Sequence, residues 1–447
     1  MRTITAIGLG AILLWGCAVT PPATAQPDTS DPDLVGTWQA TEDYFRPLIL
    51  IEPGAGGGIK AYLTDASLSK DAPFSEATVR GDSLLLALDR LSIGFSGRVV
   101  TETRIEGTYT QGGQTVALTL VPTELGQAER PQNPQSPVPY SSSDITFEGA
   151  AGVRLGGTLT VPEGQGPFPA AVLLQGSGLS DRDAEVGGHK TFLVLADHLT
   201  RAGIAVLRYD KRGDVDLDGL TRDAEGAARY LANRPEVDPA RVGLVGHSEG
   251  ALIAPRAVGL AGGAFLVLLA PPAVPVGDAL VEQNARLAAA SGAPDSYVGS
   301  VRSLMRRVVE AAGSDADSVA AAAEIEAAFS EQGLSGDALE ASVRAHMSPL
   351  FRDLAGYDPG PALRDAEVPV LAVLGSVDLF TPPEENAGPL REALAGRGTV
   401  RVVEGLNHWL QPAGTGLPDE IERIETTVDP AVLVLVADWI REQATAD

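Results

Sequence analysis

The sequence is poor in cysteine, in histidine and in positive charge. It has 447 residues and a single cysteine, Cys17, so no disulfide can form within the chain. It has 33 Lys and Arg residues and 59 Asp and Glu residues, which gives a net charge of −26. This balance argues against nucleic acid or an anionic membrane surface as an electrostatic partner. The acidic residues are spread along the chain, as is typical of a solvated surface.

Long apolar runs are also scarce, and the N-terminus holds the one that suggests an export signal. Arg2 precedes an apolar run from Ala6 to Trp15, which is too short for a permanent membrane helix. We interpret residues 1–25 as the signal and the start of a tether. We favour lipidation of Cys17 in a lipobox-like site, which gives a periplasmic or cell-envelope lipoprotein. The alternative is cleavage after Ala25 in an Ala-x-Ala site, which gives a soluble periplasmic or extracellular protein.

Residues 33–122 predict a small all-β domain, a sandwich or a barrel. Short alternating apolar runs such as Ser83–Leu88 are separated by turn signals such as Pro53–Gly58. The range contains no histidine, so we expect no catalytic group there. A role in stability or docking and a role in binding carbohydrate or the envelope both stay open. Residues 123–143, rich in Pro, Gln and Ser, predict a linker.

Residues 144–447 show the pattern of an α/β fold. Continuous apolar runs alternate with helical stretches, which indicates a mostly parallel central sheet covered on both faces. Between about 275 and 365 the strands stop, and an Ala-rich helical periodicity predicts a helical cap inserted into the sheet. The predicted strands are Ala170–Leu174, Ala205–Tyr209, Val242–Val245, Ala264–Leu269, Val370–Leu374 and Val400–Val403.

The stretch Gly246-His247-Ser248-Glu249-Gly250 fits the G-x-S-x-G nucleophile elbow. Two glycines permit the sharp turn from strand to helix that this motif requires. An apolar strand precedes the stretch and a helical run follows it. We therefore expect Ser248 to be exposed at a strand end and to act as a nucleophile.

A serine nucleophile needs a base and a carboxylate that orients that base. Of the five histidines, only His408 follows a late strand, on a loop that can reach the carboxyl edge of the sheet. Asp378 follows the predicted strand Val370–Leu374, so the order along the chain is Ser, Asp, His, as in the α/β-hydrolase motif. The other histidines lie within the elbow, before it or in the helical insertion: His247, His189, His198 and His346.

The negative oxygen formed by nucleophilic attack needs backbone N–H donors. One should be the N–H of Glu249, directly after the nucleophile. The other should come from the loop after Ala170–Leu174, where we favour Ser177 and place Gly176 second. This mechanism needs no metal or cofactor. We interpret the Glu249 side chain as structural, and the charged run Asp181–Asp183 as a network that shapes the loop.

Further motifs accompany the elbow on both sides. They are Gln175–Gly178, Asp181–Asp183, Arg208–Gly213, Gly375–Asp378, Leu406–His408 and the terminal Ala437–Ile440. With them, the region from Asp144 onward resembles bacterial α/β-hydrolases related to esterase D-type carboxylesterases and to serine aminopeptidase-like and dienelactone hydrolase-like groups. The resemblance implies an α/β-hydrolase fold, a Ser-His-Asp triad and often an N-terminal β-rich domain. Relatives often carry His where this chain has Gln175.

Three classes of function fit these residues. The first is a hydrolase of small-molecule carboxylic esters with small to medium acyl chains. The second keeps the same triad for another acyl transfer, as a serine peptidase such as an aminopeptidase, a thioesterase, a lactonase or an acyltransferase. A peptidase would need carboxylates for the substrate ammonium group, for which Glu324, Glu326 and Asp353 are candidates. The third class is an envelope scaffold with a relict site.

Overall fold

The computed structural model describes most of the chain after its first 33 residues. The predicted export signal, the lipidation of Cys17 and cleavage after Ala25 fall outside the described residues and stay predictions. The chain divides into two compact units, Met1–Gln127 with Asn284–Met347 and Ala128–Gln283 with Ser348–Asp447. The described ranges are 34–41, 47–54, 58–64, 72–88, 93–111, 114–123, 130–178, 180–213, 215–314 and 317–443.

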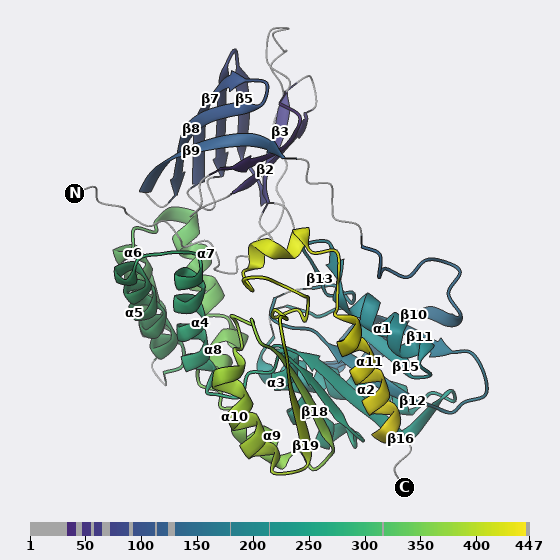
Figure 1. Cartoon of the computed structure of the whole chain (residues 1–447). Coiled ribbons are helices and arrows are strands. Elements are labelled where there is room, and N and C mark those ends of the chain that lie inside the picture. Colours follow the sequence, from purple (N-terminus) through teal and green to yellow (C-terminus); the bar gives the residue numbers. More distant parts are fainter. Residues whose placement is uncertain are drawn as a thin grey trace. The chain divides into compact units, whose positions relative to one another are not determined.

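The N-terminal strands form one antiparallel sheet, in the order β4-β3-β2-β1-β9-β8-β7-β6-β5. Successive side chains of a strand point to opposite faces of the sheet, and one face of this sheet is buried. Leu84 and Leu86 are buried, whereas Leu85 between them is 45% exposed. β3 also approaches β5, so the sheet curls back on itself. The predicted all-β domain is therefore confirmed (Figure 1). The strands are β1 (Gly36–Ala40), β2 (Leu48–Pro53), β3 (Ile59–Thr64), β4 (Ala72–Pro73), β5 (Glu76–Arg80), β6 (Ser83–Leu88), β7 (Ile93–Thr101), β8 (Arg104–Gln111) and β9 (Gln114–Thr123).

The segment predicted as a helical insertion consists of helices, as expected. In α5, Val301, Leu304, Met305 and Val308 recur at helical spacing and are buried. The Asp317 side chain accepts the N–H of Val319 at the start of α6. The helices are α4 (Val276–Ala290), α5 (Asp295–Ala312), α6 (Ser318–Glu331), α7 (Gly336–His346), α8 (Pro349–Ala355) and α9 (Gly360–Asp365).

The second sheet has the strand order β10-β11-β15-β12-β16-β17-β18-β19. β10 and β11 pair antiparallel at one edge, and all the strands from β15 to β19 in that order run parallel. This confirms the mostly parallel central sheet expected from the sequence. The strands are β10 (Tyr140–Glu148), β11 (Arg154–Pro162), β12 (Phe168–Leu174), β15 (Ala205–Tyr209), β16 (Val237–His247), β17 (Leu266–Leu269), β18 (Val370–Gly375) and β19 (Gly398–Val403).

Helices cover both faces of this sheet (Figure 1). Val172 and Leu174 of β12 pack into a core with α2, α3 and α10, whereas Ala171 and Leu173 pack into a second core with α1 and α11. Each large apolar side chain buried in these cores contributes about 1.5–3 kcal/mol to stability. Both faces of the strands are thus apolar, as their sequences predicted. The helices are α1 (Thr191–Arg201), α2 (Leu217–Ala232), α3 (Gly250–Ala261), α10 (Pro383–Leu394) and α11 (Pro430–Gln443).

The linker predicted for residues 123–143 differs from the structure at its end. β10 begins at Tyr140, inside that range, and pairs with β11 from Tyr140 opposite Pro162. Ser141, Ser142 and Ser143 are exposed on this edge strand, so they show no apolar alternation. An edge strand of serines therefore has the sequence pattern of a linker.

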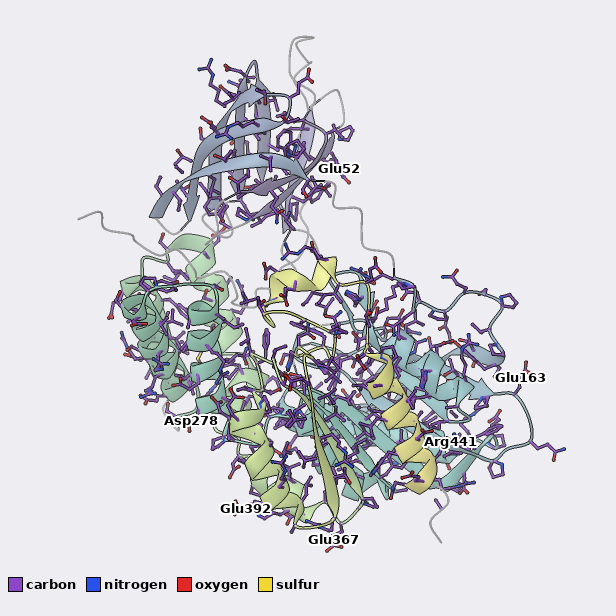
Figure 2. All side chains as sticks on the ribbon, viewed as in Figure 1. Glu52, Glu163, Asp278, Glu367, Glu392 and Arg441 are labelled. Atoms are coloured by element: carbon purple, nitrogen blue, oxygen red, sulfur yellow. The ribbon has the colours of Figure 1, made fainter. Side chains whose placement is uncertain are left out.

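The α/β unit is the unit that contains the second sheet, Ala128–Gln283 with Ser348–Asp447. Its acidic residues lie mainly at the surface. Glu163, Glu367 and Glu392 are exposed, and their side chains point away from the ribbon (Figure 2). None of the helices within the described ranges combines the length and apolar character of a membrane span.

The segment before α11 is held by polar side chains from distant parts of the sequence. Arg130 donates to the carbonyl oxygens of Ile424 and Glu422, and Gln132 Nε2 donates to that of Val428. His189 Nε2 donates to the carbonyl oxygen of Ile421 at 2.9 Å, and its Nδ1 lies 2.8 Å from the hydroxyl of Thr427.

His189 makes this region sensitive to acid. Burial, together with the nearby Arg130 charge, lowers the pKa of His189 from 6.5 to about 4. The unfolded chain takes up this proton below about pH 6.5 and the folded chain only near pH 4, so stability is lost as pH falls through that window. The expected loss is about 3 kcal/mol.

The variant His189→Gln should lack this part of the pH dependence, because an amide keeps a donor for Ile421 but does not titrate. Urea unfolding at several pH values between 4 and 7 measures the free energy of unfolding of both proteins. The difference between the two free energies of unfolding should shrink as the pH falls. If the difference stays constant with pH, His189 does not titrate as described.

Candidate active site

Ser248 occupies a sharp turn between β16 and α3. Its backbone has φ 53°, a left-handed conformation that is rare for a residue with a side chain. A Cβ at Gly246 would lie 2.2 Å from the carbonyl oxygen of Gly250, and a Cβ at Gly250 would lie 2.0 Å from that of Leu174. Both positions therefore require glycine, as the elbow motif predicts. The Ser248 N–H donates to the carbonyl oxygen of Leu269 on the next strand, at 2.9 Å.

The structure brings Ser248, His408 and Asp378 together in one hydrogen-bonded series. His408 Nε2 lies 2.9 Å from Ser248 Oγ, and His408 Nδ1 lies 2.9 Å from Asp378 Oδ2. Asp378 follows β18 and His408 follows β19, so adjacent parallel strands deliver both side chains to the same edge of the sheet. Asp378 is 2% exposed and His408 is 4% exposed.

Asp378 is held as a carboxylate by several donors. The N–H groups of Phe380 and Thr381 donate to its Oδ1, and the Thr381 hydroxyl donates to its Oδ2 at 2.7 Å. Burial alone would raise the pKa of this carboxyl, but the adjoining His408 ring and the Thr381 donors hold it below its ordinary value. Asp378 therefore keeps its negative charge beside His408.

His247 supports the backbone that carries His408. Its Nε2–H donates to the carbonyl oxygen of His408 at 2.8 Å. Burial and the proximity of His408 lower the pKa of His247 to about 4, so its ring is neutral near pH 7. The Phe380 ring stacks on the His408 ring, with the two ring centroids 4.7 Å apart. The contacts of Phe380 and Thr381 were not predicted from the sequence, although the D-x-x-T spacing fits a local side-chain cap.

The predicted backbone donors lie around Ser248. Gly176 lies in the loop after β12 and close to the elbow in space. A Cβ at Gly176 would lie 3.3 Å from Ser248 Cβ. Glu249 precedes α3, whose N-terminus carries a partial positive charge. Within the described ranges, the N–H groups of Ser177 and Glu249 have no hydrogen-bond partner. Both N–H groups are therefore available to an acceptor.

Side chains brace the loop after β12. Gln175 is 3% exposed, and its Nε2 donates to the carbonyl oxygens of Tyr209 at 2.5 Å and of Asp181 at 3.2 Å. The amide thus connects this loop to the end of β15. Arg182 pairs with Asp210 through Nε and Nη2, and Arg208 pairs with Asp183. Several residues of the charged run thus hold the loop, as expected.

The three histidines that were not chosen as the base and lie outside the elbow are elsewhere in the structure. His189 binds Thr427 and Ile421, His198 lies in α1, and His346 Nδ1 bonds the carbonyl oxygen of Ser342 within α7. No cluster of His, Cys, Asp and Glu suited to a metal ion occurs among the residues that the structure describes.

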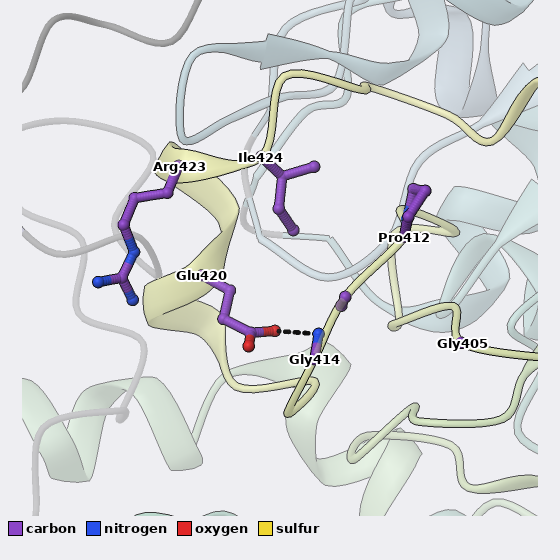
Figure 3. Close-up of a pocket in the computed structure, with 7 residues that line it drawn as sticks. Gly405, Pro412, Gly414, Glu420, Arg423 and Ile424 are labelled. Atoms are coloured by element: carbon purple, nitrogen blue, oxygen red, sulfur yellow. Dashed lines mark hydrogen bonds between the residues drawn. The ribbon is translucent and has the colours of Figure 1, made fainter.

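A pocket near the loop that carries His408 includes none of the predicted site residues (Figure 3). The pocket is lined by Gly405, Pro412, Ala413, Gly414, Glu420, Arg423 and Ile424. The Glu420 carboxylate accepts the N–H groups of Gly414, Thr415 and Gly416, so its oxygens serve the loop.

The sequence matches a family of known proteins over more than half of its length. Residues 171–416 match the model of the alpha/beta hydrolase family. The chain belongs to the alpha/beta hydrolase family. The matched segment of this α/β hydrolase includes Ser248, Asp378 and His408.

Three proteins illustrate the range of similarity to this chain. Esterase EstD of Thermotoga maritima is 29% identical over 318 residues, which are 68% of this chain and 68% of that protein. An uncharacterised protein of Mycobacterium tuberculosis is 34% identical over 130 residues, 26% of this chain and 43% of that protein. The structure of a Pyrobaculum calidifontis esterase aligns with a TM-score of 0.40 at 18% identity, over 68% of this chain and 86% of that one.

Proposed function

We propose that this α/β hydrolase cleaves carboxylic esters of small to medium acyl chain through an acyl-enzyme on Ser248. The hydrogen-bonded series Ser248–His408–Asp378, with 2.9 Å at each step, carries the proposal. A serine hydroxyl is a weak nucleophile at neutral pH, and such a series activates it. The similarity to Esterase EstD of Thermotoga maritima supports esters as the substrate class.

The proposed reaction has two halves. Ser248 Oγ attacks the acyl carbon, and His408 Nε2 takes the hydroxyl proton while Asp378 stabilises the imidazolium. His408 returns the proton to the leaving alkoxide, so an alcohol departs and the acyl group stays on Ser248. A water molecule then attacks the acyl carbon and gives its proton to His408. That proton returns to Ser248 Oγ as the carboxylic acid leaves.

The negative oxygen of each tetrahedral intermediate is proposed to bind the N–H groups of Ser177 and Glu249, with Gly176 as the second candidate for the loop donor. Their location around Ser248 and the lack of other partners for Ser177 and Glu249 in the described chain support this assignment. Each such donor typically contributes a factor of about 10²–10³ to the rate.

Hydrolysis of peptides is supported less well. A peptidase that captures a substrate ammonium group needs carboxylates free to bind it. Asp353 Oδ2 accepts the N–H of Leu217 at 3.0 Å, and Glu324 Oε1 binds Arg307 at 2.7 Å. These two of the three candidate carboxylates thus already have structural partners. Thioesters and lactones use the same acyl transfer, so they remain alternatives within the proposal.

A fluorophosphonate probe and a substrate panel test the proposal together. The probe should label the folded protein at Ser248, as read from the mass of the modified peptide. Among p-nitrophenyl acetate, p-nitrophenyl butyrate, an acyl thioester, a lactone and aminoacyl p-nitroanilides, the two esters should give the highest kcat/KM. Preference for the anilides would make the protein a peptidase. Failure of the probe to label Ser248 would support a relict site.

A further inference from the structure

Lys211 connects the two segments that carry the proposed oxyanion donors. Its Nζ donates to the carbonyl oxygen of Gly176 at 2.8 Å and pairs with Glu249 Oε1 at 2.5 Å. Lys211 lies just after β15, so it reaches the elbow from a third segment of the sheet edge. The Lys211 side chain is 5% exposed and that of Glu249 is 4% exposed. This buried cation has no part in the Ser248–His408–Asp378 series.

The contact with Gly176 acts on Ser177 through a single peptide unit. The carbonyl of Gly176 and the N–H of Ser177 belong to one planar trans peptide and point in opposite directions. A hydrogen bond that fixes the carbonyl therefore also fixes the direction of the N–H. Hydrogen bonds in a chain also polarise one another, so an ammonium group on the carbonyl makes this N–H a stronger donor.

The contact with Glu249 removes an electrostatic conflict. The carboxylate belongs to the residue directly after the nucleophile, where a negative oxygen forms during the proposed reaction. An uncompensated negative charge there would oppose that oxygen, and burial would strengthen the repulsion. The Lys211 ammonium neutralises the carboxylate and restrains Glu249, whose backbone N–H is the other proposed donor.

We propose that Lys211 is a positioning residue that orients and polarises the oxyanion hole by binding Gly176 and Glu249 together. The inference rests on the proposed acyl transfer at Ser248. It gives a function to Lys211, and it gives the Glu249 side chain a role beyond the structural one expected from the sequence. Because the pair acts on charge that develops in the transition state, it affects kcat more than KM.

The test is Lys211→Met, which keeps a long side chain but removes its charge and donors. For p-nitrophenyl butyrate, kcat should fall about tenfold to hundredfold, less than the factor expected for deleting a donor outright. KM should stay within about twofold. Affinity for a trifluoromethyl ketone, which forms a negative oxygen on Ser248, should fall in parallel with kcat/KM. If Lys211 had a purely structural role, the affinity for the ketone would not fall in parallel with kcat/KM.

The neighbouring residue supplies a matched control. Arg212 Nε pairs with the buried carboxylate of Asp223 at 2.7 Å, whereas Gly176 and Glu249 are bound by Lys211. Arg212→Met also removes a cation from a buried carboxylate, so it should lower thermal stability and leave kcat within about threefold. Equal kcat losses in Arg212→Met and Lys211→Met would overturn the inference.

A double variant covers the case in which Lys211→Met fails to fold because a buried carboxylate loses its partner. Lys211→Met with Glu249→Gln leaves no unpaired charge, yet the Gly176 carbonyl still lacks its donor. Its kcat should remain about tenfold below that of the unmodified protein. Full activity in the double variant would overturn the inference. If the unmodified protein neither hydrolyses esters nor reacts with the fluorophosphonate, the proposed function itself has failed.

Discussion

Replacement of Ser248 by alanine should abolish ester hydrolysis, with kcat falling by about 10⁶. The change removes the oxygen that His408 Nε2 contacts at 2.9 Å, and no acyl-enzyme can form without it. Alanine keeps the Cβ, so the strain of the left-handed backbone at this turn is unchanged. The measurement is kcat for p-nitrophenyl butyrate together with fluorophosphonate labelling, and both should disappear.

A second serine serves as the control for this result. Ser142 is exposed on the edge strand β10, and Ser142→Ala should leave both activity and labelling intact. Thermal unfolding of Ser248→Ala should stay close to that of the unmodified protein, which separates lost chemistry from lost structure. Hydrolysis that survives in purified Ser248→Ala would mean that another residue is the nucleophile.

Local rules explain why so much of the α/β unit could be predicted from the sequence. β15 has the predicted bounds Ala205–Tyr209, because its other residues give the apolar character that a fully buried strand needs even though Arg208 interrupts the run. The elbow could be predicted because a Cβ at Gly246 or Gly250 would collide with backbone, so the motif is a steric requirement. Asp378 and His408 could be proposed because parallel strands place their carboxyl ends at one edge of the sheet.

The parts that the sequence did not reveal depend on long-range packing. Lys211 follows Asp210 in an ordinary charged run, and only the fold places its ammonium between Gly176 and Glu249, 35 and 38 positions away. His247 likewise meets the His408 carbonyl across 161 positions. β10 was missed for a different reason, since its exposed serines carry no apolar period. Side-chain contacts between distant segments leave no local pattern to read.

The variant Asp378→Asn should lower kcat by about 10⁴ while KM changes little. Asparagine has the same size and can still accept the N–H groups of Phe380 and Thr381 through its oxygen. Its amide then points an N–H at His408 Nδ1, where the carboxylate Oδ2 stood at 2.9 Å. His408 must accept that hydrogen bond at Nδ1, so its own proton moves to Nε2 and it can no longer act as a base toward Ser248.

The expected factor corresponds to about 5.5 kcal/mol of lost transition-state stabilisation. Asp358 supplies a matched control, because its Oδ1 also accepts a backbone N–H, that of Gly360 at 2.9 Å, at an exposed turn before α9. Asp358→Asn should keep kcat within about twofold. Fluorophosphonate labelling of Ser248 should slow in Asp378→Asn by a factor similar to that in kcat, since both reactions need His408 as the base. A kcat within tenfold of the unmodified protein would show that Asp378 does not set the tautomer of His408, and the carboxylate would then have to be sought elsewhere.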